Sequence, residues 1–489
     1  MNLHPRFSRS IQMKKQLNMV LLILMLLAAA LLISGCHTTG TEDETSGPDT
    51  EDESVTLRLL WNDESNVFMD RLVHKVIREF EREHDNVTIE LETLPEDRSS
   101  RDIFFKQIRT EIMAGKGPDL FLMPTYGVPG NLLFPDVTQA MYNGIFADLS
   151  AYYDADADLG KESLNAVVMD AGVVDGCRYT LPLRYDFPVV YANPEQLEAA
   201  GLDAAVFDGS VTDVLEAIAE LGDQDAAASA AFLLEQNVSA LMGSYVNYAR
   251  EEILLDRTAF IDFWNSYTAV RDVAKGTASD SDNTWFEGYY LNETWLAKGE
   301  PLRIHRLNSC IMEAVQAKAA GAEIEMYPLR DINGDLTAIV EYYGAVGAGC
   351  AYPELAYAFL RKLLSEDRQW ERNIYATGCH MMSRGYAVRD VNSAAAYYEV
   401  LKEREVTVRI EGWQEREERL HAVEVTEADV PILQVQIDSV RYPIMEQEYN
   451  VAASIETRLQ NSNFDAGQID VEEIVDNFLR DLQFHLSEG

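Results

Sequence analysis

The sequence predicts an α/β protein whose body is divided into two lobes. Apolar residues alternate in 55–59 and 87–91, as in strands, and recur at helical spacing in 67–80 and 103–112. A short apolar run, 119–123, follows. Strand, helix, strand, helix, strand indicates a parallel sheet covered by helices. A mainly helical stretch and then a return to strands indicate a second lobe.

After the first strands and helices, the next predicted elements begin at Arg178–Asn193. This stretch reads as two extended segments around Pro182 and Pro188, because both prolines disfavour a helix there. Pro194 to about Val273 is mainly helical. Strands are then expected at 302–307, 323–327 and 337–343, and helices at 353–364 and 471–486.

These segments predict how the chain is divided. Residues 1–35 are an export signal, 36–54 a disordered acidic tether and 55–489 a folded body. We expect lobe 1 to contain about 55–190 with returning segments around 300–345. Lobe 2 is expected to contain about 194–300 with most of 350–489.

The export signal is the most apolar stretch of the chain. Lys14 and Lys15 precede fifteen uninterrupted apolar residues, Met19 to Ile33, and Ser34, Gly35 and Cys36 follow. This order is typical of a signal peptide, and the run is shorter than the ~18 residues that a bilayer-spanning helix needs. A transmembrane anchor is the alternative.

Charge excludes some partners. The chain carries −42 and its leader carries four positive charges without an acid, so the remaining 454 residues carry about −46. Such a surface repels phosphate backbones and anionic lipid headgroups. We therefore expect no nucleic-acid partner, and membrane attachment must come from another source.

The tether, residues 37–54, contains seven acids and no large apolar side chain. It cannot bury enough surface to fold, and fully extended it would reach about 60 Å. The folded body could thus move well above a membrane.

Several segments resemble known families. Leu32–Cys36 resembles the lipobox of bacterial lipoproteins, which implies that Cys36 carries acyl chains such as palmitate and becomes the first mature residue. Ile112–Leu122, Gly144–Tyr152 and Val174–Asp203 resemble successive signatures of the family 1 extracellular solute-binding proteins of bacterial ABC transporters. Glu354–Gln369 resembles a later helix of that family.

The resemblance covers 55 to about 370 and implies a periplasmic-binding-protein type II fold, in which two α/β lobes close on a solute by hinge motion. It departs from the family at Val206–Gly209 and Glu300–Arg303, so the specificity of better-known members does not transfer. The last 120 residues match poorly, and their role is open. Members mostly bind sugars, and we expect a monomer that delivers a sugar to a permease.

Sugar chemistry selects the candidate binding residues. A sugar ring offers an apolar C–H face to aromatic side chains and a hydroxyl edge to charged or amide groups. Candidates follow predicted strand ends, lie between the predicted crossings or occupy segments that face ligand in relatives. They are Trp61, Asn62, Glu64, Tyr126, Arg184, Tyr185, Asp186, Trp285, Trp295 and Tyr343. Each could instead be a packing, capping or hinge residue.

Catalytic and metal motifs are weak. The sequence contains no Gly-x-Ser-x-Gly, His-Glu-x-x-His or Cys-x-x-Cys motif, and its 82 acids make carboxylate pairs unavoidable by chance. An alternation typical of a calcium loop occurs at Asp154, Asp156 and Asp158, but Leu159 replaces the glycine of such a loop. We therefore interpret this segment as a solvated acidic turn. No catalytic residue, metal or cofactor is predicted.

Thus the sequence predicts a lipid-anchored, extracytoplasmic solute receptor of an ABC importer. A surface glycoside hydrolase and a ligand-sensing partner of a membrane kinase are the alternatives. The solute, the permease and the presence of a metal are open, as is the pairing of the remaining cysteines, Cys177, Cys310, Cys350 and Cys379.

Overall fold

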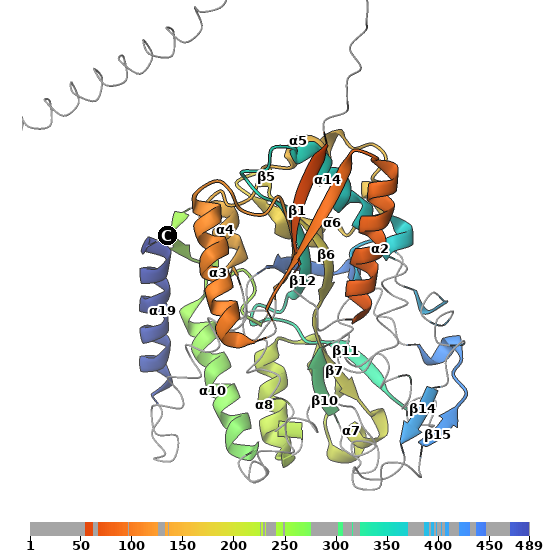
Figure 1. The fold of residues 1–489 in the computed structure, drawn as a ribbon. Helices are drawn as coiled ribbons and strands as arrows, with labels where there is room; N and C mark the ends of the chain where they lie inside the picture. The colour runs from red at the N-terminus through yellow and green to blue at the C-terminus, as the bar shows by residue number, and fades with distance from the viewer. Residues whose placement is uncertain are drawn as a thin grey trace, which may run out of the picture. The chain divides into compact units, whose positions relative to one another are not determined.

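The computed structural model describes most of the chain after residue 53 (Figure 1). The described ranges are 54–61, 67–95, 97–125, 133–134, 136–224, 226–227, 241–247, 250–274, 302–306, 323–369, 386–390, 406–409, 420–430, 437–445 and 470–488, with residues 230, 315, 393–395, 398 and 402. Ser54–Gly489 forms one compact unit, separate from Met1–Glu53.

A seven-stranded sheet organises the first part of the fold, in the order β13-β6-β12-β3-β1-β2 with β16 paired to β12. β1 pairs in parallel with β2 and β3, whereas β12 is antiparallel to β3 and β6. The strands are β1 (Val55–Trp61), β2 (Val87–Thr93), β3 (Leu120–Pro124), β6 (Thr180–Asp186), β12 (Leu336–Val346), β13 (Tyr386–Ala387) and β16 (Val440–Ile444).

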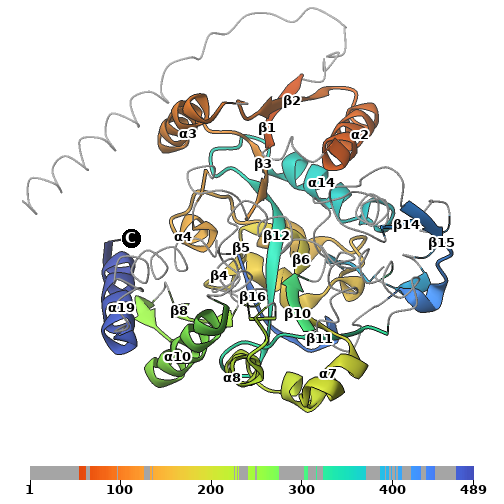
Figure 2. The same cartoon turned by 90° about the horizontal axis from the view of Figure 1, so that it is seen from below.

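Helices cover both faces of this sheet. α2 (Val67–Glu83) and α14 (Pro353–Leu363) lie side by side on one face, and α3 (Arg98–Met113) and α4 (Val137–Tyr142) lie on the other (Figure 2). α3 begins where the Asp97 carboxylate accepts from the Ser100 amide at 2.8 Å, an N-cap that satisfies an otherwise unpaired donor. Apolar side chains between the layers form the first cluster.

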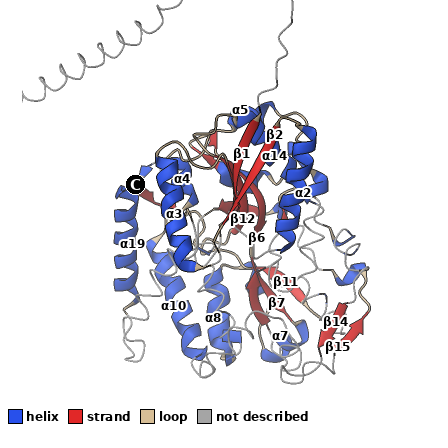
Figure 3. Cartoon of the chain, in the orientation of Figure 1, coloured by secondary structure: helices blue, strands red, loops and turns tan. Residues whose placement is uncertain are grey.

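A three-stranded antiparallel sheet, β10-β7-β11, organises the second part. Its strands are β10 (Leu302–Arg306), β7 (Pro188–Ala192) and β11 (Glu325–Pro328). Four helices accompany this sheet: α7 (Pro194–Ala200), α8 (Val211–Leu221), α10 (Arg257–Ala274) and the C-terminal α19 (Val471–Glu488) (Figure 3). They supply most of the helical residues of the second cluster. α8 begins with a reciprocal capping box between Ser210 and Asp213.

Shorter elements complete the described fold. The helices are α5 (Ser150–Ala155) and α6 (Ala166–Met169), with 3₁₀ turns η1 (Lys161–Ser163), η2 (Asp170–Gly172), η3 (Ala204–Asp208) and η5 (Glu427–Asp429). Three two-stranded sheets are β4 (Val173–Val174) with β5 (Cys177–Arg178), β8 (Val246–Asn247) with β9 (Glu252–Ile253), and β14 (Val406–Arg409) with β15 (Leu420–Val423).

The α/β class and the parallel start are confirmed, but the predicted division between lobes differs from the two clusters. β10 and β11 pair with β7 in the three-stranded sheet and not with the seven-stranded sheet expected for lobe 1. Leu302 and Tyr327 of these strands pack in the second cluster, whereas Met326 packs against the first. α14 packs in the first cluster, where Phe359 meets Phe80 edge to face at 5.4 Å, and not in lobe 2. Apolar periodicity shows that an element is buried, but not which sheet buries it.

The described helices were also compared with the length and hydropathy that a membrane span requires. None of them is both long and apolar enough to cross a bilayer.

α19 provides a test of the second cluster. Phe478 is 3% exposed and lies 5.5 Å from Phe260 of α10, ring centroid to ring centroid. We expect Phe478→Ala to lower the free energy of unfolding by about 3–5 kcal/mol, since a buried ring leaves a cavity. Phe484 on the same helix is 61% exposed, so Phe484→Ala is the matched control. Equal effects of the two changes in urea unfolding would contradict the packing of α19.

Candidate ligand-binding site

The two sheets are joined by one extended run. β6 ends at Asp186 in the seven-stranded sheet and β7 begins at Pro188 in the three-stranded sheet, with only Phe187 between them. A second connection, from β11 to β12, lies against this one, because the Leu329 amide donates to the Pro188 carbonyl at 2.9 Å. The last residues of β6 are therefore held at the junction of the sheets.

Three buried charged side chains lie in the paired strands at this junction. Arg184 is 2% exposed, and Asp186 and Glu341 are 0% exposed. Asp186 stands opposite Ile339, and Arg184 stands opposite Tyr342. Removing a charged group from water costs several kcal/mol per ion, so apolar packing alone would not favour this group. Buried charged side chains in strands that lead into a second sheet mark a candidate ligand site.

Glu341 lies at an irregularity in β12. The register with β6 shifts between Val340 and Tyr342, so Glu341 has no residue directly opposite it in β6. On the other side, the Thr125 amide donates to the Glu341 carbonyl at 3.0 Å, and the Thr125 hydroxyl donates to the Val340 carbonyl. Bulges of this kind redirect a side chain and are frequent beside functional sites. Thr125 follows β3, so the end of β3 holds the backbone of β12 beside the acid.

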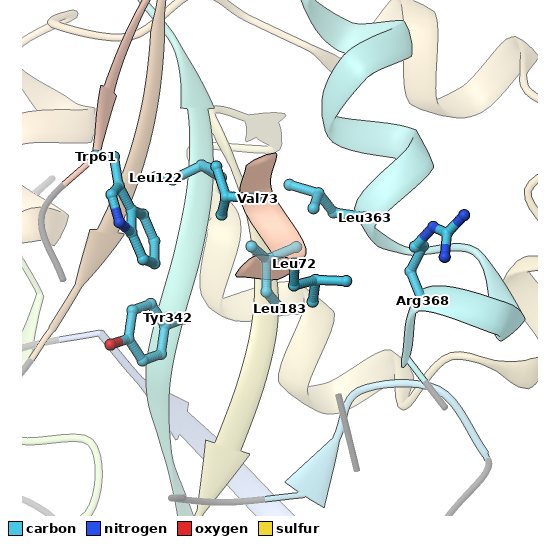
Figure 4. Close-up of a pocket in the computed structure, with 8 residues that line it drawn as sticks. All are labelled: Trp61, Leu72, Val73, Leu122, Leu183, Tyr342, Leu363 and Arg368. Carbon is cyan, nitrogen blue, oxygen red and sulfur yellow. The ribbon is translucent and has the colours of Figure 1, made fainter. Parts of the chain in front are cut away.

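Trp61, the last residue of β1, is packed inside the first cluster. It is 1% exposed, and its ring stacks on Tyr342 at a centroid distance of 6.2 Å and an angle of 24° (Figure 4). The stack borders a cavity of about 10 Å³ that is lined by Trp61, Leu72, Val73, Leu122, Leu183, Tyr342, Leu363 and Arg368. That volume is about what one water molecule needs, so the cavity cannot hold a sugar.

The two candidate tyrosines are also core residues in this arrangement. Tyr185 is 0% exposed and belongs to the first cluster, on the face of β6 opposite to Arg184 and Asp186, because side chains alternate along a strand. Tyr343 is 1% exposed, and its ring meets Phe146 at 6.2 Å. Burial raises the pKa of Tyr343 far above its ordinary value, so its hydroxyl stays protonated. Ligand binding by Trp61, Tyr185 and Tyr343 stays a prediction.

The other candidates lie outside the described residues. They are Cys36, Asn62, Glu64, Tyr126, Trp285 and Trp295. Glu341 and Thr125 were not among the sequence candidates. The signal for Glu341 is a single acid within the apolar run of β12, whose eleven residues are all buried. An unaccompanied acid in such a strand is costly and could have been singled out on that ground.

The acidic turn after α5 is held by an ion pair. Asp156 has a side chain that is only 8% exposed, and it accepts from Arg361 at 2.9 Å and from the Tyr357 hydroxyl at 3.0 Å. Asp158 is 89% exposed and lies 3.7 Å from Arg361. The interpretation of a solvated turn is therefore correct for Asp158 and wrong for Asp156. Among the described residues, no cluster of three or more His, Cys, Asp or Glu could hold a metal ion.

Comparison with known proteins shows what the chain resembles. The model of the bacterial extracellular solute-binding proteins matches residues 69–297. Over these residues the chain is similar to that family. This segment contains β2, β3, β6, β7 and the candidate residues Arg184 and Asp186. The sequence resemblance to family 1 solute-binding proteins is thus confirmed. No curated protein sequence matches the chain.

Solved structures share the two-lobed fold. A cyclic alpha-maltosyl-1,6-maltose binding protein from Arthrobacter globiformis matches with a TM-score of 0.54 and 16% identity, over 89% of this chain and 100% of that chain. The ABC substrate-binding protein Lmo0181 from Listeria monocytogenes, in complex with cycloalternan, matches with a TM-score of 0.50 and 13% identity, over 88% and 99%. A de novo designed cysteine esterase, ECH19, matches with a TM-score of 0.58 and 15% identity, over 90% and 99%. At these identities the likeness shows the fold alone.

Two of the remaining cysteines can be assigned a state. Cys177 and Cys350 are free thiols. A hydrogen bond to Asp148 is the main cause that raises the pKa of Cys177, and burial raises the pKa of Cys350 to about 12. Cys310 and Cys379 lie outside the described residues.

We expect both thiols to alkylate slowly at pH 7, because the thiolate is the reactive form and a raised pKa depletes it. Mass spectrometry after timed iodoacetamide treatment measures the rate at each cysteine, with the urea-unfolded chain as the reference. A peptide pair that links Cys177 to Cys350 would contradict this assignment.

Proposed function

We propose that the chain is a lipid-anchored, extracytoplasmic receptor that binds a carbohydrate at the junction of the two sheets and delivers it to an ABC permease. The observation that carries this proposal is the buried group Arg184, Asp186 and Glu341 beside the run from β6 into β7. The match to the model of the solute-binding family supports a binding role for the same segment.

The chemistry of the group suits a polyol. Carboxylates accept hydrogen bonds from hydroxyl groups, and a guanidinium donates to hydroxyl oxygens through several N–H groups in a fixed plane. In a site shielded from water these bonds are stronger than at the surface. Among the structural neighbours, the Arthrobacter protein is named for an oligosaccharide and the Listeria protein is in complex with cycloalternan.

Closure on the solute would occur about the two connections between the sheets. Hinges are usually a few residues at the ends of elements, and here Phe187 alone separates β6 from β7. Because Arg184 and Asp186 directly precede this residue, a small rotation there would change their positions relative to the second sheet. The site and the hinge would therefore be coupled.

Anchoring is proposed on sequence grounds. The signal-like run before Cys36 and the acidic tether at 37–54 support a chain that is exported and held by lipid. Delivery to a permease is inferred from the family. Dependence of cellular uptake on this protein would distinguish a receptor from the partner of a membrane kinase.

The direct test is thermal unfolding of the soluble fragment Thr38–Gly489 with a panel of mono- and oligosaccharides. A ligand at 100 times its dissociation constant should stabilise the fold by about 2.7 kcal/mol, and amino acids and short peptides serve as controls. Recovery of the bound sugar intact supports the receptor. Cleavage of the sugar would establish a glycoside hydrolase instead, and a shift with peptides alone would overturn the sugar assignment.

Two buried arginines provide a matched pair for the site. Arg184 lies at the junction, whereas Arg389, 7% exposed, donates to the Leu364 and Leu159 carbonyls at 2.8 and 2.7 Å within the first part of the fold. We expect Arg184→Gln to weaken sugar binding at least about tenfold, the effect of a hydrogen bond to a charged group.

Calorimetric titration measures both variants. Arg389→Gln should lower the unfolding temperature and leave the dissociation constant unchanged. Normal affinity in Arg184→Gln, or an equal loss in both variants, would rule out a ligand contact at Arg184.

A further inference from the structure

The second connection between the sheets runs from Leu329 to Thr337. Its first half is attached to the second cluster: Leu329 and Ile332 belong to that cluster, and the Ile332 amide donates to the Leu241 carbonyl at 2.8 Å. The Val211 amide at the start of α8 donates to the Arg330 carbonyl at 2.9 Å. Its second half enters β12 and the seven-stranded sheet.

Asp331 lies between the part of the segment that packs in the second cluster and the part that enters the seven-stranded sheet. It is 1% exposed. Its Oδ1 accepts from the Asn333 amide at 2.8 Å and the Asp335 amide at 3.0 Å, and its Oδ2 accepts from the Thr337 hydroxyl at 3.1 Å. The carboxylate thus shapes the turn with one oxygen and holds the second residue of β12 with the other.

Gly243, in a loop of the second cluster, lies against Asp331 Oδ2. It follows Leu241 and Met242 of that cluster and has a φ of +64°, a conformation that glycine adopts without strain. A Cβ at this position would lie 2.6 Å from Asp331 Oδ2 and 3.1 Å from Asn333 Nδ2. Asp331 Oδ2 is therefore enclosed between a loop of the second cluster and the start of β12.

We propose that Asp331 is a positioning residue that sets the angle between the two sheets by joining the Leu241–Gly243 loop to Thr337. Its hydrogen bonds must rearrange if the turn twists, so it favours one arrangement of the junction over others. The proposal concerns the same junction as the proposed receptor function, but it predicts a property of the chain without ligand.

Thr337 allows a test that leaves the turn intact. Thr337→Val keeps the shape of the side chain and removes the hydroxyl that Asp331 Oδ2 holds, whereas Thr337→Ser keeps the hydroxyl. Hydrogen exchange is measured by mass spectrometry on the full chain in detergent and without ligand. It reports how often the hydrogen bonds donated by the Leu329 and Ile332 amides open. We expect exchange of these amides to rise about fivefold in Thr337→Val, the effect of one buried hydrogen bond on a two-state equilibrium, and to stay at the original rate in Thr337→Ser.

Two further variants complete the test. Thr268→Val removes a comparable hydroxyl bond, from Thr268 to the Trp264 carbonyl at 2.7 Å within α10, and should leave exchange at Leu329 and Ile332 unchanged. Gly243→Ala should accelerate it, because the added carbon displaces Asp331 Oδ2.

Two results would overturn the positioning role of Asp331. Unchanged exchange in both Thr337→Val and Gly243→Ala overturns the proposal. An equal rise at Leu59 and Leu60 of β1 also overturns it, because the loss would then be one of global stability. If exchange responds as expected but no sugar binds, the positioning role stands and the proposed receptor function fails.

Discussion

One continuous extended run, Thr180–Ala192, belongs to both sheets, and the arrangement of the junction depends on it. Its first half pairs with β12 and β13, and its second half pairs with β10 and β11. Pro182 and Pro188 restrict the backbone on either side of the crossing. Since no loop separates the two halves, the direction in which one sheet leaves the other is set within a few residues.

Sequence periodicity predicted the local structure well. The alternation of Val55, Leu57 and Leu59 corresponds to β1, and the prolines at 182 and 188 correctly indicated two extended segments. Sequence periodicity did not predict which strands pair with one another. β10 pairs with β7, more than 100 residues earlier in the chain, and its apolar pattern would be the same in either sheet. Long-range pairing depends on tertiary packing, which a local period does not encode.

The candidate site was predicted in part. Arg184 and Asp186 were candidates because they lie between the predicted crossings, and both are buried near the end of β6, beside the start of β7. Glu341 was missed, because its position results from an irregular register between two distant strands. For Asp156, the partner Arg361 is about 200 residues away in sequence, so the exposure of the acid could not be inferred from the turn alone.

β2 forms one edge of the seven-stranded sheet in the described part of the chain. An open edge strand can pair with an edge strand of another molecule and so begin aggregation. Here Glu90 is exposed on this edge, Glu92 is engaged by Arg58 at 2.9 Å, and the chain as a whole carries −42. Two copies approaching edge to edge would repel each other at low ionic strength. The colloidal stability of the protein should therefore be lowest in concentrated salt, where this repulsion is screened.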